Sequence, residues 1–234
     1  MSASDPASAW LLLQTGRRRA ADNMALDELL LSRAAEFGHP ILRFYSWAEA
    51  AATFGYAQRI AEVESFTLLR PLIRRPTGGG LVPHDRDWTY SLVFPPEHPW
   101  YSLRAEESYR RVHDWITASF RALQVQAELS ECCDKPVVGR CFVGAEKFDV
   151  LAGGKKIAGA AQKRNKLGLL VQGSIQPPPG KAYDRAAWER ALLEMGAQEQ
   201  GIHWRELKPS EQLLERAAEL DRQKYATAEY NQRR

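Results

Sequence analysis

The chain has 234 residues, of which 44% are hydrophobic and 26% are charged. This composition is typical of a water-soluble globular protein, and the length suits one domain with a proper core. The formal net charge of +3 is too small to predict nucleic-acid binding by itself, although it suits a small acidic protein as partner.

The N-terminus and the cysteines indicate a cytoplasmic protein. Residues 1–8 are small and polar and lack the basic and apolar regions of a signal peptide. Apolar runs stay far below membrane-spanning length, so we expect no membrane association. Three cysteines form an odd set, and the neighbours Cys132 and Cys133 are poorly placed to bond each other. A disulfide framework is therefore not expected, which fits a reducing compartment.

The N-terminal half is predicted to hold strands and one helix. A short strand at 10–13 opens the chain, and Asp22 is expected to cap a helix whose leucines at 26, 29 and 30 share one face. Gly38-His39-Pro40 ends that helix. Further strands are predicted at 41–47, 71–75 and 88–94.

The C-terminal half is predicted to begin with a long amphipathic helix capped by Ser102. A hairpin follows, with strands at 148–152 and 155–158 around Gly153-Gly154, and then a strand at 167–175. Helices are expected at 184–195 and 210–223. Strands and helices that do not alternate predict an α+β fold with mixed β-sheets flanked by helices. We expect one domain over 1–234, with a helical C-terminal extension from about 184 to 234.

The segment 74–80 is a candidate binding loop. It reads Arg74-Arg75-Pro76-Thr77-Gly78-Gly79-Gly80, and three glycines in a row let a backbone approach a ligand closely. The arginines suit a carboxylate or phosphate, although a plain turn between strands would also explain the glycines. It is not a P-loop, because no Gly-Lys-Ser/Thr follows, and 81–83 looks extended rather than helical. His84 and Asp85 come next and either orient a substrate or serve the strand alone.

The segment 153–164 contains Lys156 in a half-buried strand. Its amine either faces solvent or points into a pocket, where it can bind an acyl oxygen or act as a base. Gly159, Ala160 and Ala161 leave room for an acyl chain and offer backbone N–H groups to an oxyanion.

Cys141 lies fifteen residues before Lys156 and follows Arg140. Nearby cations favour a reactive thiolate, whereas an inert buried thiol is the alternative. The histidines and cysteines show no Cys-x-x-Cys or His-x-x-x-His spacing, so we predict no metal site. A thiol and an amine beside a glycine loop point to an enzyme that transfers an activated carboxyl group.

These segments resemble the lipoate-protein ligase and octanoyltransferase family, whose more distant relatives are the biotin protein ligases. The resemblance covers nearly the whole chain. It rests on the motifs at 23–28, 42–47, 54–58, 74–85 and 154–162. It implies a biotin/lipoate ligase-like catalytic domain, in which the family's essential lysine falls on Lys156 and the glycine loop lies over the acyl group. The glycine-and-arginine signature of biotin ligases is absent from the sequence.

Within this family the chain is most similar to the cysteine-dependent octanoyltransferases. Those proteins carry a Cys-Phe about fifteen residues before the lysine, matched by Cys141-Phe142, and a Thr-Tyr-Ser strand, matched by 89–91. Three positions depart from their pattern, because Gly80, Ala160 and Gln172 stand where arginine, serine and histidine are common.

The resemblance implies a transferase in which Cys141 carries the acyl group as a thioester and Lys156 assists. The expected donor is octanoyl acyl carrier protein, and the acceptor is a lysine of a lipoyl domain or of the glycine-cleavage H protein; no cofactor is required. One alternative is an ATP- and Mg²⁺-dependent lipoate ligase that forms lipoyl-adenylate. Another is a non-catalytic acyl- or lipoate-binding homologue. Substrate-binding residues are expected among Arg74, Arg75, Thr77, Gly78, Gly79, Gly80, His84, Asp85, Gly159, Ala160 and Ala161.

Overall fold

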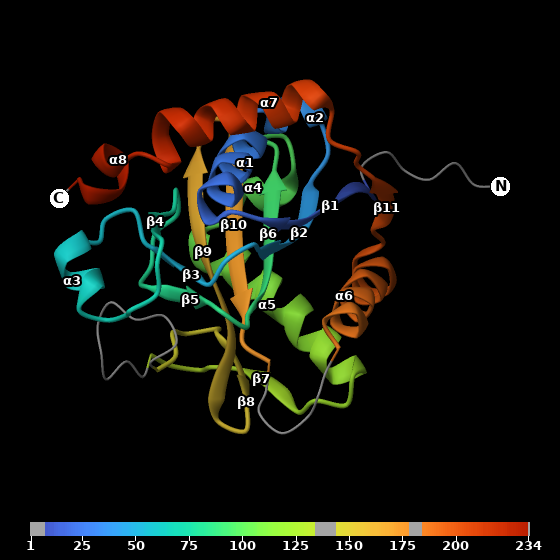
Figure 1. The fold of residues 1–234 in the computed structure, drawn as a ribbon. Coiled ribbons are helices and arrows are strands. Elements are labelled where there is room, and N and C mark those ends of the chain that lie inside the picture. The colour runs from blue at the N-terminus through green and yellow to red at the C-terminus, as the bar shows by residue number, and fades with distance from the viewer. Residues whose placement is uncertain (1–7, 134–143, 178–183, 234) are drawn as a thin grey trace.

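The computed structural model describes residues 8–133, 144–177 and 184–233. Within these residues it has an eight-stranded mixed sheet in the order β11-β1-β2-β6-β10-β9-β8-β7 and a three-stranded sheet in the order β4-β3-β5. Helices cover the large sheet, and the small sheet lies at its side (Figure 1). The predicted α+β class with mixed sheets is confirmed.

The strands of the large sheet are β1 (Ala9–Arg18), β2 (Ile41–Trp47), β6 (Trp88–Phe94), β7 (Ala127–Leu129), β8 (Val150–Ala152), β9 (Lys155–Asn165), β10 (Gly168–Ile175) and β11 (His203–Glu206). The small sheet has β3 (Ala51–Phe54), β4 (Leu72–Arg74) and β5 (Val82–His84). The helices are α1 (Ala20–Ser32), α2 (Ala34–Phe37), α3 (Ile60–Glu64), α4 (Pro99–Ser102), α5 (Ala105–Ala122), α6 (Arg185–Gln200), α7 (Glu211–Leu220) and α8 (Ala228–Gln232), with a π-helical turn at Asp221–Tyr225.

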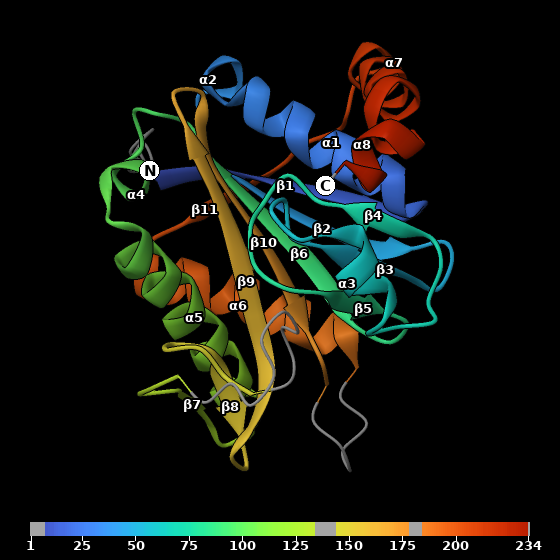
Figure 2. The ribbon, with the colours of Figure 1, turned by 90° about the vertical axis from the view of Figure 1, so that its left-hand side faces the viewer.

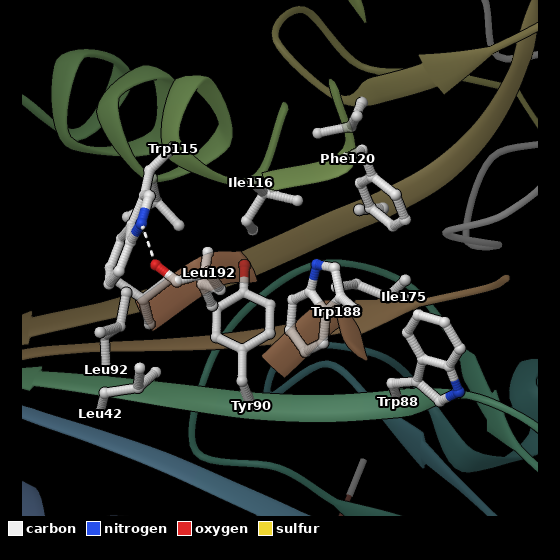
Figure 3. Close-up of a cluster of buried hydrophobic side chains, with 14 of the residues drawn as sticks. Leu42, Trp88, Tyr90, Leu92, Trp115, Ile116, Phe120, Ile175, Trp188 and Leu192 are labelled. Atoms are coloured by element: carbon white, nitrogen blue, oxygen red, sulfur yellow. Dashed lines mark hydrogen bonds between the residues drawn. The ribbon is translucent and has the colours of Figure 1, made fainter. Parts of the chain in front are cut away.

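Two helical layers enclose the large sheet (Figure 2). Helices α5 and α6 pack on one face, where Trp115 and Trp188 meet side chains of β2 and β6 such as Leu42 and Tyr90. Figure 3 shows this core, in which the Trp115 indole N–H donates to the carbonyl of Leu192 at 2.8 Å. Helices α1 and α7 cover the other face. Because strand side chains alternate between faces, each buried strand serves both layers and is apolar almost throughout.

The predicted strands and the β8–β9 hairpin are confirmed, whereas two helix starts differ. Helix α1 begins at Ala20, so Asp22 lies in its first turn, and α5 begins at Ala105, because Ser102 belongs to α4. Neither helix has a side-chain cap at its start. The segment 184–233 contains more than helices, since it adds strand β11 to the edge of the large sheet beside β1.

The small sheet carries the glycine loop. Strand β4 leads into it and β5 leaves it, and β3 lies between these two strands. Gly55, just after β3, faces the loop so closely that a Cβ atom there would lie 1.9 Å from the carbonyl oxygen of Gly79. Glycine is therefore required at Gly55 for the loop to keep its place.

Every helix among the described residues is too short or too polar to span a bilayer.

A close contact inside the large sheet gives a test of this packing. A Cβ atom on Gly173 would lie 2.0 Å from Cζ of Tyr90, whose side chain is buried in the core. We therefore expect Gly173→Ala to lower the free energy of unfolding by about 1–3 kcal/mol, the usual cost of overpacking. Urea unfolding measures the change. Gly78→Ala is the control, because a Cβ atom on Gly78 would meet nothing beyond its chain neighbours within 4 Å, and equal losses in both variants would contradict the packing argument.

Candidate active site

One pocket lies between the two sheets and holds about 440 Å³ of space, part of it open to solvent. Helix α1, both sheets and the start of the glycine loop contribute to its wall. The lining residues are Met24, Tyr45, Trp47, Thr53, Arg75, Val82, His84, Thr89, Lys156, Gly159, Ala160, Ala161, Gln172, Gly173 and Ser174. The wall is mainly apolar with a few polar groups, which is the usual character of a small-molecule site.

Lys156 is the cation at one side of this pocket. Its side chain is 6% exposed, and its Nζ atom forms an ion pair of 2.7 Å with Oδ2 of the fully buried Asp149. A Cβ atom on Gly159 would lie 2.7 Å from that Nζ. Glycine at this position therefore makes room for the lysine, and the alternative of a solvent-facing strand lysine is excluded.

Asp149 is held from several sides. The Tyr109 hydroxyl donates to Oδ1, and the backbone N–H of Glu146 donates to Oδ2 at 2.6 Å. Burial and the neighbouring Asp149 charge raise the pKa of Tyr109 well above its usual value, so this hydroxyl stays protonated and able to donate. The same hydroxyl accepts the N–H of Ala160 at 3.2 Å. Ala160 therefore lines the pocket while its N–H group is already used.

His84 stands at another part of the wall between two fixed partners. Its Nδ1 lies 2.8 Å from Oδ2 of Asp87, and its Nε2 lies 2.8 Å from Oγ1 of Thr53. The ring stacks on the indole of Trp47 with 3.8 Å between centroids. Both ring nitrogens of His84 therefore have a side-chain partner within hydrogen-bond distance, and the orientation of the ring is fixed.

The glycine loop is tied to the sheets by side chains at its start. The Arg75 guanidinium donates to the carbonyl oxygens of Thr53 and Gly78 and to Oγ1 of Thr77. Thr77 in turn donates to Oε1 of Gln172 at 2.8 Å, and the Gln172 amide donates to Asp27 at 2.7 Å. Gln172 thus connects the loop to helix α1.

The structure separates the predicted substrate-binding residues into two groups. Six of the predicted site residues line the pocket: Arg75, His84, Lys156, Gly159, Ala160 and Ala161. Thr77, Gly78, Gly79 and Gly80 lie in the loop beside it, Asp85 borders a separate hollow, and Arg74 is buried against the C-terminal helix α8. Their roles with substrate stay predictions. Cys141 lies outside the described residues, so its predicted convergence with Lys156 also stays a prediction.

Three residues of this site were not singled out from the sequence. Tyr109 fits the apolar face of α5 by its spacing, and Asp149 and Asp87 are single acidic residues near turns. Tyr109 is 40 residues from Asp149, so local spacing could not pair these two residues. Asp87, by contrast, lies three residues after His84, and that spacing is the signal that could have found it.

The comparisons with known proteins identify the family. Residues 19–176 match the model of the lipoyl protein ligase A/B catalytic domain. The chain belongs to this family. It is 35% identical over 179 residues to an octanoyltransferase, LipM, of Bacillus subtilis, covering 71% of this chain and 64% of that protein. A LipM from an Exiguobacterium species is 36% identical over 181 residues, covering 72% and 66%. The match thus spans slightly less than two thirds of each relative.

Solved structures of the family share the fold. Protein Ta0514 of T. acidophilum with bound lipoic acid has a TM-score of 0.77 and 25% identity, covering 97% of this chain and 99% of that one. A lipoate-protein ligase A bound with ATP has a TM-score of 0.75 and 25% identity, covering 96% and 98%. The family match at 19–176 contains the whole small sheet and every residue that lines the pocket, whereas β1 and β11 of the large sheet lie outside it.

Over the described ranges, no group of three or more histidine, cysteine, aspartate or glutamate side chains could hold a metal ion.

The buried ion pair can be tested without any assay of activity. Asp149→Asn alone leaves the buried Lys156 ammonium without its carboxylate partner. In the double variant Lys156→Met removes that ammonium too, so no unpaired charge stays buried. We expect the double-mutant cycle in urea unfolding to give a coupling of about 1–3 kcal/mol. The exposed pair Lys147–Glu106 is the matched control and should show much weaker coupling. Additive effects at Lys156 and Asp149 would contradict the ion pair.

A buried histidine beside this pair gives a prediction about pH. Burial, together with the Lys156 charge, lowers the pKa of His113 to about 3, below its ordinary value of 6.5. Between these two pH values the unfolded chain binds a proton at His113 that the folded protein excludes. The contribution of His113 to the free energy of unfolding is therefore complete above pH 6.5 and decreases as the pH is lowered toward 3. Urea unfolding over a pH series should show a shallower fall in His113→Phe than in the wild type. Identical slopes would show that His113 is readily protonated in the folded protein.

Proposed function

We propose that this protein is an octanoyltransferase that attaches an octanoyl group to a lysine of a lipoyl domain or of the glycine-cleavage H protein. The observation that carries the proposal is the buried Lys156 amine at the wall of a mainly apolar pocket, on the family's lysine motif. Its similarity to curated octanoyltransferases over 71% of the chain supports the choice of reaction.

In the proposed reaction, Cys141 is the nucleophile. Its thiolate attacks the carbonyl carbon of octanoyl acyl carrier protein, a bond forms between sulfur and carbon, and the donor leaves as a thiol after it takes up a proton. The acceptor lysine, as a free amine, then attacks the enzyme thioester, and the Cys141 thiol is released as the amide forms. Thioester exchange is nearly isoenergetic and amide formation is downhill, so no ATP is required.

The pocket residues have distinct parts in this proposal. The Lys156 ammonium, held by Asp149, orients the carbonyl and exchanges protons with the leaving and attacking groups. Backbone N–H groups near Gly79 and Gly159 stabilise the oxyanion, each worth about 3 kcal/mol. The N–H of Ala160 is excluded from this set, because it is donated to Tyr109. The odd set of three cysteines, for which no disulfide framework is expected, supports a cytoplasmic location for this reaction.

A second candidate is an ATP-dependent lipoate ligase. The solved relatives that carry ATP or lipoic acid are consistent with it, as is Gly80, which stands where the octanoyltransferases often carry arginine. Lys156 would then hold the phosphate of lipoyl-adenylate, and Cys141 would have no part in the chemistry.

Intact-mass spectrometry distinguishes these candidates. With octanoyl acyl carrier protein, the wild type and Cys133→Ser should each gain one octanoyl group, whereas Cys141→Ser should gain none. Full transfer activity in Cys141→Ser, or an unmodified wild type, would reject the thioester. Pyrophosphate release that depends on lipoate and ATP would identify a ligase. Tight acyl binding without transfer to any lipoyl domain would identify a non-catalytic carrier.

A further inference from the structure

Arg74 is the first residue of the basic and glycine-rich segment, yet its side chain is 1% exposed and points away from the pocket. The guanidinium is surrounded by carbonyl oxygens from two separate parts of the chain. On one side it donates to the carbonyls of Tyr56 and Gln58 at 2.7 and 2.6 Å. On the other it donates to those of Tyr230 and Asn231 at 3.2 and 3.1 Å, and also to that of Arg233.

The carbonyls on the second side belong to helix α8 and to Arg233, the residue after it, and α8 lies beside β4 (Figures 1 and 2). The last carbonyls of a helix have no partners within the helix and carry its partial negative charge, so a guanidinium is well suited to them. The side chain of Asn231 adds a second contact between α8 and β4, because its Oδ1 accepts a hydrogen bond from the backbone N–H of Arg74 at 2.8 Å. The Asn231 amide is itself fixed, because it donates to the carbonyls of Tyr225 and Thr227.

The carbonyls on the first side belong to the turn after β3, which supports the glycine loop. The N–H of Tyr56 donates to the carbonyl of Thr77 at 2.9 Å, and the turn packs through Gly55 against Gly79. The N–H of Arg75, next to Arg74, donates to the carbonyl of Phe54 at 2.9 Å. Arg74 therefore joins helix α8 directly to the part of the small sheet that sets the position of the loop.

We infer that α8 is a positioning element for the glycine loop and that it acts through Arg74 and Asn231. In this role Arg74 is a positioning residue and does not contact substrate. Loss of α8 contacts would let the turn at Tyr56 and Gln58 move and would loosen the glycine loop over the pocket. The acyl group would then be held less well, while the Lys156–Asp149 pair, which lies on β9 and before β8, would be unchanged.

Hydrogen–deuterium exchange of the free protein tests this inference without any substrate. Asn231→Ala removes the acceptor for the Arg74 N–H, and we expect amide exchange in 77–81 to become about tenfold faster, the scale of ordinary coupling between sites. Ser210→Ala is the control, because it removes a cap of α7, where Ser210 accepts from the N–H of Leu213, without touching Arg74. It should leave loop exchange as in the wild type.

A kinetic measurement accompanies the exchange experiment and rests on the proposed function. We expect Asn231→Ala to raise the KM for the octanoyl donor by about tenfold and to lower kcat as well. The loosened loop binds the acyl group and also carries the backbone N–H near Gly79 that stabilises the oxyanion. If the wild type transfers no octanoyl group, the proposed function fails, and the exchange result still decides the inference about α8.

Two exchange results would overturn the inference. One is wild-type exchange of the loop in Asn231→Ala, and the other is equal acceleration in Ser210→Ala, which would reveal general loosening. If Asn231→Ala gives no folded protein, Arg74→Lys replaces it, because a lysine keeps the charge but cannot bridge both groups of carbonyls. Faster loop exchange in Arg74→Lys supports the inference, and wild-type exchange there rejects it.

Discussion

The buried carboxylate of Asp27 is the interaction on which this architecture depends. It accepts hydrogen bonds from Arg43 at 2.6 Å, Ser91 at 2.8 Å, Tyr45 at 3.1 Å and Gln172 at 2.7 Å. These partners come from β2, β6 and β10, while Asp27 itself lies on α1. Both charges of the Asp27–Arg43 pair are fully buried, so each requires the other and the surrounding hydrogen bonds. The helix can therefore occupy one place on the sheet, and the adjoining wall of the pocket is fixed with it.

Two buried carboxylates, Asp27 and Asp149, contact residues that line the pocket, and they have different partners. The hydrogen-bond partners of Asp27 lie on strands of the large sheet, and one of them, Gln172, connects it to Thr77 at the start of the glycine loop. Asp149, by contrast, holds a lysine that lines the pocket, and Tyr109 donates to its other oxygen. A preorganised cation at the wall of a mainly apolar cavity suits a reaction in which negative charge develops on a carbonyl oxygen. One ion pair, Asp27–Arg43, thus fixes helix α1 on the large sheet, and a separate one, Asp149–Lys156, fixes the cation at the pocket wall.

Local patterns in the sequence predict the positions of the strands, but they do not predict which side chains of different elements come into contact. The runs at 41–47 and 88–94 are mostly apolar because both faces are buried, and the structure confirms them to the residue. Helix starts were less accessible, because α1 and α5 begin after Arg19 and Arg104 without a side-chain cap. Lys156 was found from its glycine-rich surroundings. The sequence does not predict its partner Asp149, because these two side chains come together only through the pairing of β8 with β9.

Arg74 and Arg75 show why a motif can mark a site without every residue in it touching the ligand. Successive side chains of an extended segment point to opposite faces, so Arg74, the last residue of β4, and Arg75, the residue after it, have different surroundings. Arg75 turns to the pocket and braces the glycine loop from within, whereas Arg74 turns to α8 and binds its last carbonyls. The loop is consequently held from both faces of the small sheet. Such a double attachment lets three consecutive glycines, which would be costly to order alone, keep a defined shape beside the pocket.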